Sequence, residues 1–196
     1  MTLGSLIAIL ISSVLIENYI FSRFLGICPF LGLSEKPSTA FGMGCAVTFV
    51  MTLSSIITWA LYHYVLTPFN LTYLKTIAFI LVIACLVQLI EMFLKKFVPS
   101  LYSALGIYLP LITTNCAILG AALLCIQNDY NLLESVIFSF GSAVGWTIAI
   151  IIFAGVRARV TFADTPKSFE GTPIALVTAS LIAMAFAGFQ GVVLPF

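Results

Sequence analysis

The first long apolar run of this chain is interrupted by the stretch FLGICPFLG at residues 24–32, in which Gly26, Pro29 and Gly32 surround a cysteine. A second stretch, ITTNCAILG at residues 112–120, lies in another apolar run. When the two cysteines are aligned, the Leu-Gly pairs that end both stretches also align. Glycine loosens a helical backbone and proline lacks the N–H that a helix needs. The two stretches therefore predict broken helices at matching positions of a duplicated chain.

The composition around these stretches is that of a membrane protein. Hydrophobic residues make up 62% of the 196 residues and charged residues only 8%, with a mean hydropathy of +1.19. A soluble domain carries about a quarter charged residues, so the soluble enzyme classes are excluded. The net charge of +1 offers no basic stripe for nucleic acid. We expect an integral protein of the lipid bilayer that binds no nucleic acid.

Six segments are apolar enough to cross ~30 Å of hydrocarbon, which takes ~20 helical residues. They cover residues 3–24, 38–64, 71–94, 100–127, 133–156 and 172–194. The connections between them are short and hold most of the charged residues. The sequence thus predicts an all-α polytopic membrane protein that forms a single membrane domain over residues 1–196.

The basic residues predict the orientation of this domain. With six spans, seven of the eight basic residues fall on the side of the first, third and fifth connections, and only Lys75 falls on the side of the termini. The seven are Arg23, Lys36, Lys95, Lys96, Arg157, Arg159 and Lys167. Cytoplasmic connections carry the excess of lysine and arginine. We therefore expect both termini on the non-cytoplasmic side.

Three spans in each half make the two halves inverted repeats, about residues 1–98 and 99–196. Transporters built in this way place their functional site near the midplane, on helices broken at matching positions. At ~1.5 Å per residue, straight helices would carry Cys28 and Cys116 to opposite membrane faces. Broken helices bring them together at mid-depth, where irregular backbone is tolerated when protein surrounds it. Our hypothesis is that the two cysteines meet.

Two matched cysteines at helix breaks favour thiolate ligation of a soft metal or an iron–sulfur cluster. The alternative is that each cysteine is a small buried hydrophobe, which is our interpretation of Cys45, Cys85 and Cys125. A [2Fe–2S] cluster takes four protein ligands. Because Cys28 and Cys116 supply half of these, the cluster hypothesis implies a second subunit that supplies the rest.

Two carboxylates lie within apolar runs, where ionisable groups are costly and mark ion paths or partner contacts. Glu17, with the neighbouring Asn18, is a candidate for contact with a coupling ion or with a partner protein. Glu91 is a further candidate for an ion path, although it lies one helical turn from Lys95 and is equally consistent with a surface pair.

Two other features predict local structure. Asn115 precedes the second cysteine and is expected to hydrogen-bond the broken backbone. Gly141 and Gly145 are one helical turn apart and predict close packing between helices.

The two cysteine stretches, together with residues 88–92 and 141–146, resemble the RnfA/NqrE family of membrane subunits, and the similarity extends over essentially the whole chain. The order Gly-Ile-Cys-Pro-Phe in the first stretch and Thr-Thr-Asn-Cys in the second are closer to the RnfA branch. Residues 16–18 and the pair Gly145-Trp146 also resemble the NqrE branch.

The resemblance implies six helices in two inverted triplets, with the first and fourth helices broken. It implies a subunit of the Rnf complex of the bacterial cytoplasmic (inner) membrane, an ion-translocating oxidoreductase that passes electrons from reduced ferredoxin to NAD⁺ while moving Na⁺ or H⁺. A [2Fe–2S] cluster would be shared with a homologous, oppositely inserted RnfE-like subunit, and Cys28 and Cys116 match the ligand positions. The other Rnf subunits (B, C, D and G) would be further partners, and no complete active site is expected in this chain alone.

Three alternatives remain at this point. In the first, the chain is an NqrE-type subunit of a Na⁺-translocating NADH:quinone oxidoreductase. In the second, it is a metal-free secondary transporter with the same inverted repeats. In the third, it is a structural subunit whose cysteines only pack.

Overall fold

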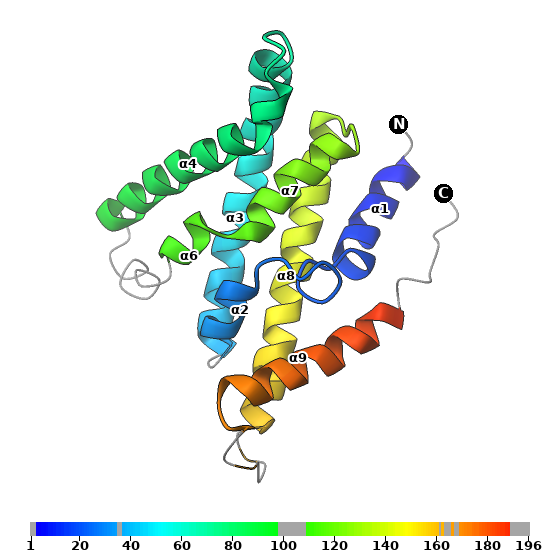
Figure 1. The fold of residues 1–196 in the computed structure, drawn as a ribbon, viewed down its shortest axis with the longest axis vertical. Coiled ribbons are helices and arrows are strands. Elements are labelled where there is room, and N and C mark those ends of the chain that lie inside the picture. The colour runs from blue at the N-terminus through cyan, green and yellow to red at the C-terminus, as the bar shows by residue number, and fades with distance from the viewer. Residues whose placement is uncertain are drawn as a thin grey trace.

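The computed structural model of the chain describes residues 3–34, 37–97, 109–160, 162, 166 and 169–188, and every regular element there is helical (Figure 1). In chain order the elements are α1 (Leu3–Ile11), the π-helix η1 (Ser12–Ile16), α2 (Ile27–Leu33), α3 (Pro37–Leu61), the π-helix η2 (Tyr62–Leu66), the 3-10 helix η3 (Thr72–Leu74), α4 (Lys75–Phe97), α6 (Leu109–Thr113), α7 (Cys116–Gln127), α8 (Leu132–Val160) and α9 (Thr172–Ala187). The predicted all-helical class is confirmed for these residues.

Four helical stretches in the described part of the chain are long and apolar enough to cross a membrane. They are Pro37–Leu66, Thr72–Phe93, Pro110–Gln127 and Leu132–Val160, and they correspond to the second, third, fourth and fifth predicted spans. Two further apolar helices, Leu6–Ile16 and Thr172–Ala187, are shorter. The end of the predicted sixth span, residues 189–194, lies outside the described residues, and the number of six spans stays a prediction.

The first predicted span, residues 3–24, is not one helix. Its helix widens to a π-helix at Ser12 and ends at Ile16, and residues 17–26 form turns before α2 begins. The predicted extent of this helix is therefore wrong, because the chain turns eight residues earlier than its apolar run ends. The predicted break before Cys28 is present.

The fourth segment is also broken, as predicted. Helix α6 ends at Thr113 and α7 begins at Cys116, so two residues outside either helix separate them. Residues 98–108, which hold the beginning of the predicted span 100–127, lie outside the described residues.

The two longest helices, α3 and α8, lie side by side along the long axis of the molecule (Figure 1). Gly44 of α3 faces Thr147 of α8 so closely that any side chain at Gly44 would overlap the threonine. Around this contact Met43, Val47 and Ile150 are fully buried. Small residues let two helix backbones approach, and larger ones fill the space beside them, so this pair forms the frame of the fold.

The broken helices pack across the two halves of the chain. Helix α1 and η1 lie against α8, where a Cβ added to Gly145 would be 2.7 Å from the carbonyl oxygen of Val14. The close packing predicted from Gly141 and Gly145 is confirmed. In the same manner α7, from the second half, packs against α3 of the first. Each half thus supports the broken helix of the other, which is the arrangement that an inverted repeat predicts; the repeat itself stays a prediction.

Candidate functional site at the two helix breaks

The two cysteine stretches meet at the breaks of the first and fourth segments. The backbone N–H of Gly26 donates a hydrogen bond to Sγ of Cys116, with 2.9 Å between the nitrogen and the sulfur, across 90 residues of sequence. Cys28 is the second residue of α2 and Cys116 is the first residue of α7. The stretches 24–32 and 112–120 are therefore in direct contact, as the broken-helix hypothesis expects.

Gly26 has a backbone conformation that this contact requires. It precedes α2 with φ 78° and ψ 28°, in the left-handed region. A Cβ built on it would lie 2.6 Å from Nε1 of Trp146, 3.2 Å from Cβ of Ala117 and 3.3 Å from Oδ1 of Asn115. Only glycine combines the positive φ with the missing side chain. The backbone at this position consequently comes close to both α7 and α8.

Asn115 explains why the fourth segment restarts at a cysteine. Its backbone is extended, with φ −72° and ψ 112°, and its Oδ1 accepts a hydrogen bond from the N–H of Ala117 at 3.0 Å. This is the N-cap geometry that begins a helix, so the expectation that Asn115 hydrogen-bonds the broken backbone is confirmed.

Two buried N–H groups beside this contact have no acceptor among the described residues. They are Nε1 of Trp146, whose side chain is fully buried in α8, and Nδ2 of Asn115, which is 4% exposed. Buried polar groups are nearly always hydrogen-bonded. The other tryptophan, Trp59, follows that rule, since its Nε1 donates to the carbonyl of Tyr130 at 3.0 Å.

The cysteines of the chain differ in their surroundings. Cys28 is exposed and Cys116 is partly exposed, so the site opens to the outside of the chain on the α2 side. Cys45 and Cys85 are exposed on α3 and α4, whereas Cys125 is buried with its Sγ 3.6 Å from Oγ of Ser139. No group of three or more histidine, cysteine or acidic side chains able to hold a metal ion occurs among the described residues.

Asn18 holds the turn at the first break. Its Nδ2 donates to the carbonyl of Gly145 at 2.9 Å, and its Oδ1 accepts from the N–H of Ile20 at 3.1 Å and of Phe21 at 3.4 Å. The side chain is 2% exposed. Both polar atoms of the Asn18 side chain are therefore engaged: Nδ2 attaches the turn to α8, and Oδ1 bonds the backbone of the turn itself.

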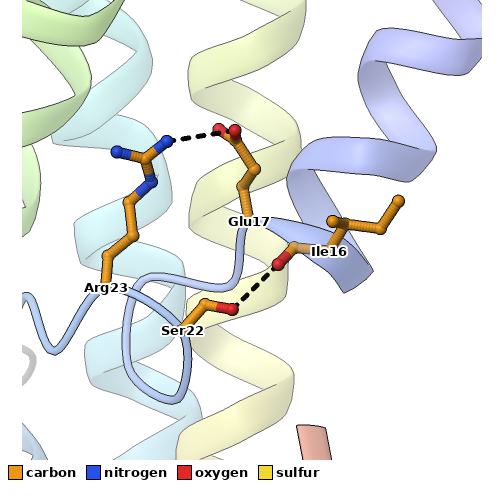
Figure 2. A network of polar contacts seen from close by, with 4 residues as sticks. All are labelled: Ile16, Glu17, Ser22 and Arg23. Carbon is orange, nitrogen blue, oxygen red and sulfur yellow. Dashed lines mark hydrogen bonds and ion pairs between the residues drawn. The ribbon is translucent and has the colours of Figure 1, made fainter. Parts of the chain in front are cut away.

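Glu17 forms an ion pair within the same turn (Figure 2). Nη2 of Arg23 lies 3.0 Å from Oε1 of Glu17, and the hydroxyl of Ser22 donates to the carbonyl of Ile16 at 2.9 Å. The other carboxylate oxygen, Oε2, is buried and accepts no hydrogen bond within the described part of the chain. The two contacts close residues 17–23 into a loop between η1 and α2.

Arg23 also belongs to the first break. Its backbone N–H donates to the carbonyl of Asn18, whose side chain is bound to Gly145 in the middle of α8, and its guanidinium is paired with Glu17. The orientation of the chain stays a prediction, and it can be counted without Arg23. Of the seven basic residues on the predicted cytoplasmic side, six remain once Arg23 is removed, against Lys75 alone on the other.

Glu17 also acts on the connection between α7 and α8. Burial raises the pKa of the Tyr130 phenol above its ordinary value, and the negative charge of Glu17 adds to that rise. Glu91 lies elsewhere, partly buried on α4. The contacts described above at the two breaks come from residues 17–26, α7 and α8.

Sequence reasoning missed two residues that shape the site. Arg157, expected in a cytoplasmic connection, lies in α8 and donates to the carbonyl of Leu31 at 2.9 Å and to Oγ of Ser34 at 2.8 Å, which secures the end of α2. Trp146 was visible only as part of a family resemblance. The sequence feature that could have pointed to Trp146 is its position in the middle of the predicted span 133–156. Tryptophan prefers the membrane interfaces, so a central tryptophan is unusual.

The fold and the site together define a class: helical membrane proteins in which two interrupted helices meet, each with a cysteine at its break. Residues 6–193 match the family described as "Rnf-Nqr subunit, membrane protein", and the chain belongs to the Rnf-Nqr family. The resemblance expected from the cysteine stretches is confirmed.

Curated relatives cover nearly the whole chain. The A subunit of the Na(+)-translocating ferredoxin:NAD(+) oxidoreductase complex of Acetobacterium woodii is 58% identical over 187 residues, 95% of this chain and 97% of the relative. The A subunit of the ion-translocating oxidoreductase complex of Syntrophotalea carbinolica is 57% identical, over 96% of this chain and 98% of the relative. The protein of that same name from Aeromonas salmonicida is 52% identical, over 94% and 96%.

Proposed function

We propose that this chain is the A subunit of an ion-translocating oxidoreductase complex of the bacterial cytoplasmic membrane, where it carries electrons through a [2Fe–2S] cluster shared with a homologous subunit. The observation that carries the proposal is the hydrogen bond from Gly26 to Sγ of Cys116, which joins the two cysteine stretches. The names of the relatives support the role in an ion-translocating oxidoreductase. Ferredoxin and NAD⁺ as the electron donor and acceptor of the complex follow the name of the Acetobacterium woodii relative.

The residues at the breaks fit half of an iron–sulfur site. Two thiols lie on adjoining segments, and one of them already accepts an N–H. Gly26 leaves space that a side chain would fill, and two buried N–H groups next to it have no acceptor in the described part of the chain. Thiolate ligands supported by N–H donors are the usual surroundings of such clusters.

When bound, the cluster supplies a one-electron carrier within the membrane. The chain's own residues would do the rest: Cys28 and Cys116 ligate iron as thiolates, Gly26 donates to the sulfur of Cys116, and Asn18 holds the turn against α8. The packed pair α3 and α8 keeps both breaks in place.

The exposure of Cys28 supports a shared cluster. A [2Fe–2S] cluster takes four protein ligands, and the described residues offer only two cysteines here. We propose that an RnfE-like subunit of inverted orientation closes the open side and supplies the other two. The exchange of broken helices between the halves of this chain supports six spans in two inverted repeats, and the B, C, D and G subunits would complete the assembly.

The ion path is the second part of the proposal. Glu17 is its first candidate because Oε2 is buried and accepts no hydrogen bond among the described residues, and its partner Arg23 would respond to charge at the neighbouring cysteines. Asn18 would position Glu17, while Glu91 on α4 would lie on a separate part of the path.

The test is to purify the native complex, count its iron and record its EPR spectrum with and without Cys28→Ala or Cys116→Ala. Each substitution is expected to abolish one [2Fe–2S] signal and to remove about two irons per complex. Cys85→Ala, at an exposed position on α4, is the control and should leave both unchanged.

A signal that survives Cys28→Ala at full intensity refutes the ligand assignment. Two further measurements separate the alternatives. A metal-free transporter would keep its ion transport in the double variant Cys28→Ser, Cys116→Ser. If the cysteines only pack, their substitution would lower the stability of the complex without removing a redox signal.

A further inference from the structure

We infer that the indole N–H of Trp146 and the side-chain N–H of Asn115 donate hydrogen bonds to sulfur at the cysteine site and raise the reduction potential of its cluster. This inference rests on the proposed function and adds to it. It assigns two residues, neither of which ligates iron, to the control of electron transfer.

Trp146 provides the first observation. Its side chain is fully buried, yet Nε1 has no hydrogen-bond acceptor among the described residues. The same Nε1 lies 2.6 Å from the position that a Cβ of Gly26 would occupy. Since the N–H of Gly26 bonds Sγ of Cys116, the indole points to the place where both cysteine stretches converge.

Asn115 provides the second observation, from a different element. Its Oδ1 is fixed by the N–H of Ala117, and this bond also sets the direction of Nδ2 on the same amide group. Nδ2 is buried and has no acceptor in the described part of the chain, and the next residue is Cys116. The indole of Trp146 from α8 and the amide of Asn115 at the cap of α7 therefore both lie beside Gly26, whose own N–H bonds Sγ of Cys116.

The simpler explanation is that Trp146 only fills volume. Indole N–H groups normally find a partner when buried, and Trp59 of this chain does so with the carbonyl of Tyr130. Two N–H groups without an acceptor among the described residues, on side chains that both lie at Gly26, are better explained by an acceptor that the chain alone lacks. Sulfur ligands and the bridging sulfides of a cluster are such acceptors.

The consequence for electron transfer follows from charge. Reduction adds one negative charge to the cluster, and N–H donors to sulfur stabilise the more negative state. Hydrogen bonds to the sulfurs are among the factors that set cluster potentials. Removing one donor should therefore make the cluster harder to reduce.

The experiment is a redox titration of the EPR signal that Cys28→Ala removes, in the purified whole complex. Trp146→Phe is expected to keep this signal and its iron, but to lower the reduced-to-oxidised ratio at a fixed potential about tenfold, which for one electron is a shift of about 59 mV to lower potential. Trp59→Phe is the matched control, because it removes an indole N–H at a distant site, and should leave the potential unchanged.

Asn115→Ser is the second variant, since serine keeps the N-cap and removes Nδ2. It is expected to lower the potential in the same direction, and Asn128→Ser, at the exposed other end of α7, is its control. This variant decides the inference where Trp146→Phe fails to assemble a cluster.

The outcomes separate the inference from the proposed function. A wild-type complex without a [2Fe–2S] signal dependent on Cys28 refutes the proposed function. A wild-type signal with potentials unchanged in the variants that retain it overturns only the inference. Loss of cluster and iron from both Trp146→Phe and Asn115→Ser would assign these residues a purely structural role and would also overturn it.

Discussion

Gly26 joins the two breaks because side chains from α8, from α7 and from the cap of α7 all approach its backbone. Its amide is used by Cys116, and the space where a side chain would lie is taken by Trp146, Ala117 and Asn115. The sequence indicated a break here from the glycines and the proline. It gave no sign of the positive φ or of the tryptophan, because both depend on segments more than 80 residues away.

Gly26→Ala should therefore disrupt the site. The left-handed conformation alone costs about 1–3 kcal/mol for a residue with a side chain, and the added Cβ would also collide with Nε1 of Trp146. We expect a lower apparent melting temperature of the purified complex and loss of the Cys28-dependent EPR signal.

Gly32→Ala is the matched control for this prediction. Gly32 lies in α2, and among the described residues no atom outside its own helix turn lies within 4 Å of an added Cβ. Alanine also stabilises a helix interior relative to glycine. If the two variants have the same melting temperature and the same EPR signal, the left-handed conformation of Gly26 is not required.

At the scale of elements, the turn at residues 17–26 is held by a small set of polar contacts within an apolar protein. Asn18 attaches it to α8, the Ser22 hydroxyl returns to Ile16, and Arg23 pairs with Glu17 (Figure 2). Residues 17 and 23 both lie in the predicted span 3–24, and nothing in the sequence indicated that their side chains pair. The ion pair explains why a charged residue is tolerated in this turn.

Removing one charge of this pair should lower the stability of the complex more than removing both charges. Glu17 and Arg23 are 32% and 38% exposed in the chain, so we expect Arg23→Gln to destabilise by about 1–2 kcal/mol, between the values for surface and buried pairs. The double variant Glu17→Gln, Arg23→Gln should recover part of this loss, because no unpaired charge remains.

Thermal unfolding of the purified complex measures both effects. Arg159→Gln, at an exposed position near the end of α8, is the control for loss of a positive charge and should change the melting temperature little. A double variant that is no more stable than Arg23→Gln would contradict the prediction.

At the scale of the whole molecule, α3 and α8 cross at Gly44 and Thr147 and receive the broken helices of opposite halves. This exchange brings Gly26, which precedes α2, against Cys116 at the start of α7, so that two distant stretches of the sequence touch. Figure 1 shows the loop between α1 and α2 beside the middle of α8, and α7 beside α3. Neither half would form this site by itself.

The orientation of the molecule gives a further prediction. With Arg23 assigned to the break, six of seven basic residues outside it still mark one face as cytoplasmic, and we expect both termini outside. Alkaline phosphatase fused after Phe196 or after Asn70 should be active, while green fluorescent protein fused after Lys96 should fluoresce. An inactive phosphatase at both positions, with fluorescent protein active there instead, would reverse the proposed topology.

The sequence alone determined the membrane class, the three spans 38–64, 71–94 and 133–156 to within a few residues of their helices, and the two interruptions. These properties depend on local composition: apolar length decides whether a segment leaves water, and glycine, proline and asparagine decide where a helix stops. The hydrogen bond of Asn115 to the broken backbone was predicted correctly because a helix cap bonds backbone groups within three residues of itself.

Tertiary structure alone decided the contact between Gly26 and Cys116, the pairing of Arg23 with Glu17 and the position of Trp146 beside Gly26. Each of these depends on how helices from opposite halves pack, and packing selects partners by shape and by unsatisfied hydrogen bonds across long sequence separations. No local pattern carries that information. The sequence therefore determined which residues interrupt the helices, whereas the fold decided what the interruptions face.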